Sequence, residues 1–339
     1  MLSIHHQSRT NITWLFLFAI SFSACSPQVT STLLPLNNTL EVANVGQGNL
    51  TTLESTETIQ AANPTVFLPT TFPTIQNTPY PCGDVICILP GHFVFELPIG
   101  FGFNQQVEPS YAYGSTQNGK REPHHGVEFI NAAGTPVLAA GDGIVTFAGN
   151  DSNQQFGWGV NFYGNLVIIE HVVQGYDVPI YTLYGHLSKV LVNTGDNVTT
   201  GKIIGEVGLS GKAMGAHLHF EVREDINDYA HTRNPELWLN INSRNGALVG
   251  QIFNEKDEVR RYPDLQLVSL DNPGSPKIHP VPYTDASLNS DDNYQEVFMV
   301  GNLPPGKYEL SFTPNGKPQT VNFEVFPGKI IRITYRTKY

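Results

Sequence analysis

Short runs of strand-forming residues, separated by glycine-containing turns, recur over most of the chain and limit the folds that it can adopt. Examples are "GTPVLAAGDGIVTFAG", "NLVIIEH" and "IYTLYGHL". Valine, isoleucine, threonine, tyrosine and phenylalanine favour strands, and glycine marks the turns between them. Charged residues make up only 14% of the chain, which also holds 31 glycines and 24 prolines. We therefore expect a mostly β protein.

The pattern changes near residue 246, which predicts a second β domain. "GALVGQIF", "LQLVSL", "TVNFEVF" and "KIIRITY" are strand patterns at short spacing, as in a small β-sandwich. The turn "GNLPPGKYEL" resembles those of prealbumin-like or carboxypeptidase-regulatory-like sandwiches. This region holds one histidine, His279, and no catalytic constellation. We assign residues 245–339 to an accessory sandwich, which serves either as a binding module or as a structural spacer.

The first 24 residues have the pattern of a secretory signal peptide. A weakly basic head is followed by an apolar run from Ile12 to Phe22 and then by small residues; the run is too short to span a bilayer. "FSAC" resembles the lipobox of bacterial lipoproteins, except that Phe22 stands where leucine is usual. We expect an exported envelope protein that is anchored through lipid on Cys25. The alternative is ordinary cleavage nearby, which would leave Cys25 free and the protein secreted.

Residues 25–90 separate this signal from the predicted domains and indicate a stalk. Most of the segment is rich in threonine, proline, asparagine and serine and is nearly uncharged, as in flexible, partly extended chains. Cys82 and Cys87 stand at its end with four residues between them. In an exported protein this spacing favours a local disulfide over a metal site.

The charge of the chain excludes one class of partner. The net charge is -11, and there is no lysine or arginine between Arg9 and Lys120. Binding nucleic acid requires clustered cations that neutralise phosphates, so we expect no nucleic-acid partner. The charge does not indicate an oligomeric state.

Six of the eleven histidines lie between residues 124 and 219. A single histidine on a strand is usually a structural residue, but six in one region of low charge indicate a functional site. Alternate strand residues share a face, so His217, His219 and Glu221 of "HLHFEV" should point away from the apolar side. In "HHGVEF", His124 and Glu128 would lie about 13 Å apart in a straight strand. We expect Gly126 to permit a bend that brings them together. Two imidazoles and one carboxylate are a known donor set for catalytic zinc.

The ordered motifs H-x-G-x-E, "YGHL" and "HLHFEVR" resemble those of lysostaphin/LytM-type zinc metalloendopeptidases, which cut peptide bonds in peptidoglycan. The resemblance implies an antiparallel β-sheet core, a duplicated hybrid motif, within residues 91–244. It implies one Zn²⁺ held by His124, Glu128 and His219. His217 matches the catalytic histidine, and His186 matches the histidine that orients the water or stabilises the oxyanion. Glu128 departs from the family pattern, because aspartate is usual there.

Two other classes of function remain open at the level of sequence. The domain could be a non-catalytic module that binds peptidoglycan or activates a separate amidase. Alternatively, the chain could be an adhesion or scaffold lipoprotein in which the C-terminal sandwich is the working part. The complete set of histidines favours the hydrolase, but the sequence does not indicate which peptide bond is cut.

Overall fold

The computed structural model describes residues 82–240 and 244–338, which belong to one compact unit. Strands predominate, and the helices among the described residues are 3-10 turns of three residues. These are η1 (Pro109–Tyr111), η2 (Tyr229–His231), η3 (Pro235–Leu237) and η4 (Pro314–Gly316). The predicted mostly β fold is confirmed. None of the helices in this part of the chain is long and apolar enough to cross a bilayer.

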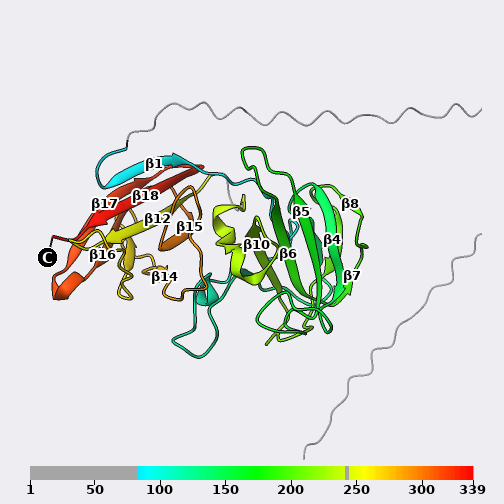
Figure 1. Ribbon diagram of the computed structural model, residues 1–339. Helices are drawn as coiled ribbons and strands as arrows, with labels where there is room; N and C mark the ends of the chain where they lie inside the picture. Colours follow the sequence, from blue (N-terminus) through cyan, green and yellow to red (C-terminus); the bar gives the residue numbers. More distant parts are fainter. Residues whose placement is uncertain (1–81, 241–243, 339) are drawn as a thin grey trace, which may run out of the picture. The chain divides into compact units, whose positions relative to one another are not determined.

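A seven-stranded antiparallel sheet forms the first half of this unit (Figure 1). Its strand order is β11-β10-β6-β5-β4-β8. Strand β2 pairs with Leu218–Phe220 of β10, on the edge opposite β6 that also pairs with β11. A three-stranded sheet of order β3-β9-β7 accompanies it. The strands are β2 (Val127–Phe129), β3 (Pro136–Leu138), β4 (Gly143–Asn150), β5 (Asn165–His171), β6 (Ile180–Leu187), β7 (Lys189–Val190), β8 (Asn197–Val198), β9 (Ile203–Glu206), β10 (Leu218–Glu224) and β11 (Thr232–Arg233).

Strand β10 carries the alternation that the sequence predicts. Leu218, Phe220 and Val222 are fully buried in the main hydrophobic core. His219 and Glu221 belong to the opposite face, where Glu221 contacts His219. Burying three large apolar side chains contributes several kcal/mol, and a one-residue slip would reverse both faces. The core therefore fixes the direction in which His219 points.

The second half is a β-sandwich, as predicted. A five-stranded sheet of order β1-β18-β12-β15-β14 packs on a three-stranded sheet of order β13-β16-β17. Pairing is antiparallel except between β12 and β18, which run parallel. The strands are β1 (Ile86–Pro90), β12 (Gly246–Phe253), β13 (Gln266–Ser269), β14 (Val281–Pro282), β15 (Phe298–Leu303), β16 (Gly306–Phe312), β17 (Gln319–Val325) and β18 (Lys329–Arg336).

The end of the predicted stalk is part of this sandwich. Strand β1 pairs with β18 along its whole length, and Figure 1 shows the two strands side by side. The apolar sequence "ICILP" explains the difference, because its side chains gain more by burial than by remaining in a solvated linker. Cys82 and Cys87 form the expected disulfide. The signal segment, Cys25 and the stalk up to residue 81 lie outside the described residues.

One hydrophobic core contains residues from both halves. Ala247, Val249, Met299 and Ile330, from the strands of the sandwich, lie in the same cluster as Trp238 of the first half. A boundary at residues 244 and 245 stays a prediction, since the described residues on both sides form one compact unit.

Candidate metal centre

His124, Glu128 and His219, the three predicted metal ligands, lie together. One donor atom from each falls within 4.8 Å of the other two. The Nε2 of His124 is 3.2 Å from the Nδ1 of His219 and 3.8 Å from the Oε1 of Glu128. The two histidines are buried, and Glu128 is nearly so. The structure thus brings together residues that stand at opposite ends of the first half of the unit.

The approach of β2 to β10 depends on Gly126. A Cβ atom at this position would lie 2.5 Å from the Phe220 carbonyl oxygen and 2.9 Å from the imidazole of His219. Gly126 lies at a bend, as expected, and it adopts this conformation without a positive φ. Its missing side chain leaves room for the His219 ring beside the chain that carries His124 and Glu128.

Backbone carbonyl groups orient three of the four histidines. The Nδ1 atoms of His124, His186 and His217 lie 2.6, 2.8 and 2.7 Å from the carbonyl oxygens of Tyr111, Ser210 and Gly215. A carbonyl oxygen only accepts hydrogen bonds, so each Nδ1 carries the proton and donates it. In the neutral ring the Nε2 atom then keeps its lone pair, and it is available to a metal or a water.

His219 has the opposite arrangement. Its Nε2 lies 3.0 Å from the Oε1 of Glu221, while its Nδ1 faces His124. A hydrogen bond from Nε2–H to the carboxylate leaves the lone pair on Nδ1. The lone pairs of His124 and His219 are therefore directed at each other's ring nitrogen and not at the protein surface.

His186 reaches the cluster through an irregularity in β6. Tyr184 and Leu187 both belong to the main core, so regular alternation would not place both on one face. His186 has a φ of 62°, and the pairing of β5 with β6 shifts register next to it. This bulge turns the His186 ring to the opposite face, 4.8 Å from the ring of His217.

His217 stands beside the three candidate ligands without joining them. Its Nε2 is 3.4 Å from the Oε1 of Glu128 and forms no hydrogen bond, although it is buried. A buried nitrogen without a hydrogen bond, next to a carboxylate and two lone-pair nitrogens, fits a centre that takes a metal ion and a water. The donor set of two imidazoles and one carboxylate suits Zn²⁺.

Burial lowers the pKa of three histidines of the cluster and so favours their neutral form. It lowers the pKa of His124 well below the usual value, and the neighbouring His219 acts in the same direction. Burial also lowers the pKa of His217 and, together with the two histidines beside it, lowers that of His186 to about 3. Neutral imidazoles are the form that binds metals and accepts protons.

Sequence patterns alone did not identify the buried groups behind His219. Glu221 is fully buried. Arg223 pairs with it, and the hydroxyl of Tyr163 donates a hydrogen bond to it. The alternation in "HFEVR" already places Glu221 and Arg223 on the histidine face, but no sequence signal points to Tyr163.

Two loops contribute aromatic side chains near the cluster. Tyr111 stacks on the ring of His124 at 4.0 Å, and the guanidinium of Arg121 lies 4.7 Å over the Tyr111 ring. From the other loop, Phe156 borders a cavity of about 320 Å³ that Tyr229 also lines. Tyr229 in turn stacks on His125, which neighbours His124.

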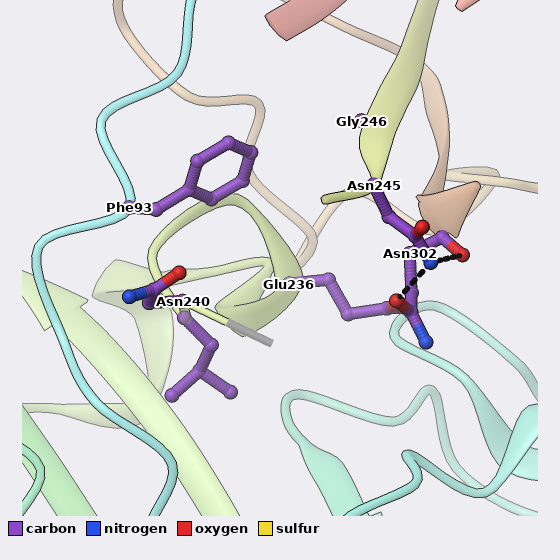
Figure 2. Close-up of a pocket in the computed structure, with 7 residues that line it drawn as sticks. Phe93, Glu236, Asn240, Asn245, Gly246 and Asn302 are labelled. Atoms are coloured by element: carbon purple, nitrogen blue, oxygen red, sulfur yellow. Dashed lines mark hydrogen bonds between the residues drawn. The ribbon is translucent and has the colours of Figure 1, made fainter. Parts of the chain in front are cut away.

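A second, smaller cavity lies away from the histidines, between η3 and the sandwich strands. Figure 2 shows Glu236 facing Asn302, whose carbonyl and side-chain oxygens accept hydrogen bonds from Asn245. Burial raises the pKa of Glu236 to about 7. The cavity holds about 10 Å³, enough for about one water. The site has no nitrogen or sulfur metal ligand among its lining residues.

Comparison with known proteins finds similarity over the part of the chain that holds the cluster. Residues 122–234 match the model of Peptidase family M23. Over 100 residues the chain is 38% identical to the peptidoglycan DD-endopeptidase ShyA of Vibrio cholerae and 40% identical to the DD-carboxypeptidase/endopeptidase Mpg of Neisseria meningitidis. Each match covers 30% of this chain, which spans only 20% of the length of either relative.

Among solved structures, the catalytic domain of a mutant of the prophage-encoded M23 protein EnpA from Enterococcus faecalis is 28% identical, with a TM-score of 0.34. That match covers 43% of this chain and 97% of the EnpA domain. The family resemblance inferred from the motifs is confirmed for residues 122–234.

Proposed function

Because residues 122–234 form a domain of peptidase family M23, we propose that this protein is a zinc-dependent endopeptidase that hydrolyses peptide bonds in peptidoglycan. One observation carries the proposal: His124, Glu128 and His219 present three donor atoms within 4.8 Å of one another. His217 and His186 lie beside them with lone pairs on Nε2. Together these residues supply a metal site and two groups that interact with water.

When bound, zinc supplies Lewis acidity, which makes water nucleophilic near neutral pH and polarises a peptide carbonyl. His217 acts as the general base. Its Nδ1–H is held by the Gly215 carbonyl oxygen, so the Nε2 lone pair accepts the proton of the attacking water. The protonated ring then returns that proton to the leaving amine, and the products are a carboxylate and an amine.

His186 orients the water in this proposal. Its Nδ1 donates to the Ser210 carbonyl oxygen, so the Nε2 of the neutral ring accepts a hydrogen bond and has no proton to donate. Of the two roles that the resemblance allows, this geometry favours holding the water over stabilising an oxyanion.

With peptidoglycan as its substrate, the protein would act in the cell envelope. We propose that residues 1–24 direct export and that Cys25 carries a lipid anchor. The disulfide between Cys82 and Cys87 supports an oxidising compartment. Incorporation of labelled palmitate into the wild type, and not into Cys25→Ser, tests the anchor.

The activity is tested with purified full chain on defined sacculi, followed by mass spectrometry of the released muropeptides. We expect new peptide termini that disappear with a chelator and return with Zn²⁺. His217→Ala serves as the inactive control, because it keeps the three ligands. Release of amidase products, or no release with zinc-loaded protein, would refute the endopeptidase. No release combined with tight wall binding would favour the non-catalytic alternative.

A further inference from the structure

We propose that Glu221 is a positioning residue that fixes His219 in the tautomer with the proton on Nε2, so that Nδ1 serves as the metal-binding atom. This inference rests on the proposed function for the identity of the metal. It concerns a residue that touches neither the metal position nor the substrate. Its basis is the geometry of one buried group of side chains on the histidine face of β10.

The position of Glu221 allows it to fix the tautomer of His219. It is fully buried, two residues from His219 on the same strand, with Oε1 3.0 Å from the His219 Nε2. An ionised carboxylate only accepts hydrogen bonds. The nitrogen that faces Glu221 therefore carries the proton, and Nδ1 is left to face His124 at 3.2 Å.

Two further side chains hold the carboxylate still. Arg223 donates a hydrogen bond from Nε to the Oε2 of Glu221 at 2.8 Å, and its Nη2 lies 2.7 Å from the same oxygen as an ion pair. The Tyr163 hydroxyl donates to Oε1, the same oxygen that accepts from His219. Arg223 is itself tied to the Phe156 carbonyl oxygen at 2.9 Å. A buried carboxylate with these partners keeps one orientation, and hence so does the imidazole.

His219 differs from the other three histidines of the cluster in the kind of group that accepts its hydrogen bond. Backbone carbonyl oxygens orient His124, His186 and His217, and no side-chain substitution removes those acceptors. His219 alone among the four depends on a side chain for its tautomer. The inference can therefore be tested by mutation at one residue, with the other three rings as internal references.

The test compares Glu221→Met with Glu221→Gln. Both variants remove the charge, keep a similar volume and leave Arg223 without its carboxylate partner, but only glutamine keeps an oxygen that accepts from Nε2. Two-bond proton–nitrogen NMR of the zinc-free protein reports the tautomer of each histidine. We expect a mixture of tautomers at His219 in Glu221→Met, and the Nε2–H form in the wild type and in Glu221→Gln.

Zinc affinity, measured by competition with a chromophoric chelator, should follow the tautomer. We expect a loss of about 10- to 100-fold in Glu221→Met, as for other residues that orient metal ligands, and a smaller loss in Glu221→Gln. Glu224→Gln is the matched control. It removes another buried carboxylate of β10, which pairs with Arg233, and it should leave the His219 signals and the zinc affinity unchanged.

Unaltered His219 signals and a zinc affinity within twofold of wild type in a folded Glu221→Met variant would overturn the inference.

If the Glu221→Met variant does not fold, the variant Tyr163→Phe provides the test of the inference. Tyr163 and His219 share Oε1 as acceptor, so losing the hydroxyl should strengthen the remaining hydrogen bond and shift the His219 Nε2–H resonance. No shift would reject the role of Glu221. Since the tautomer is measured without zinc, a wild type that binds no zinc refutes only the proposed function.

Discussion

Glu128 and His219 occupy directly paired positions on the antiparallel strands β2 and β10. Paired residues of neighbouring strands place their Cβ atoms about 4.5–5.5 Å apart on one face of a sheet. Two candidate ligands that stand far apart in the sequence are thus held together by strand register. The same contact brings Glu128 to 3.4 Å from the Nε2 of His217.

Shortening or neutralising Glu128 should weaken zinc binding. Glu128→Asp withdraws the carboxylate by one methylene from a position fixed by β2, and we expect a loss of about tenfold in affinity. Glu128→Gln loses the charge and should bind more weakly still. Chelator competition measures both, with Glu206→Gln, outside the cluster, as the control. A Glu128→Gln variant with wild-type affinity would exclude Glu128 as a ligand.

The two histidines of "HLH" should separate metal binding from catalysis. His219→Ala removes a candidate ligand, so both zinc content and muropeptide release should be lost. His217→Ala should keep one zinc per chain while the turnover rate falls by about 10²- to 10⁴-fold, the usual contribution of a general base. Metal analysis and muropeptide release are measured on the same samples. Full turnover in His217→Ala would contradict the assigned role.

An alanine at position 126 should displace His219. Its Cβ would meet the Phe220 carbonyl oxygen at 2.5 Å and the His219 Nε2 at 2.9 Å. Relieving the overlap should cost about 1–3 kcal/mol of unfolding free energy and weaken zinc binding. Gly159→Ala is the control, because a Cβ there has nothing within 4 Å. Equal stability and zinc affinity in both variants would show that β2 has room to move.

Glu236 should make the protein less stable as the pH rises. Burial raises its pKa in the folded state to about 7, whereas an unfolded chain has a glutamate pKa of about 4.3. The folded state therefore holds its proton more tightly, and stability is lost as the pH rises from about 4.5 through 7. Glu236→Gln should raise the unfolding free energy at pH 8, on the order of 2 kcal/mol, and change it little at pH 4. Denaturant unfolding at the two pH values measures this. An equal effect at both would contradict a buried ionisable group.

Removal of residues 245–339 should destabilise the remainder. The sandwich contributes Ala247, Val249, Met299 and Ile330 to a core that also contains Trp238, and deletion would expose this apolar surface to water. We expect aggregation or a loss of cooperative unfolding for residues 91–244, measured by scanning calorimetry. The control is a chain of residues 82–339. A cooperative transition within a few degrees of the control would show that the peptidase region folds independently.

The sequence was sufficient to predict the β class and the C-terminal sandwich, and the five residues that it proposes for the site lie together in the structure. Each of these depends on local pattern. Alternation in "HLHFEV" assigns the faces of β10, and the motif spacing identifies the family. The sequence was not sufficient to predict that the end of the stalk forms a strand of the sandwich. The pairing of β1 with β18 joins segments from the two ends of the described chain, and no local pattern indicates such a contact.

The residue types at the candidate centre, and the faces on which His219 and Glu221 lie, are determined by the sequence itself, because strand alternation is a local property of the backbone. Only the tertiary structure decides which nitrogen of each histidine is left with its lone pair. Those lone pairs depend on the carbonyl groups of Tyr111, Ser210 and Gly215 and on the carboxylate of Glu221. For His124 and His186, the acceptor comes from a distant part of the chain, which reaches the imidazole only after the strands have paired.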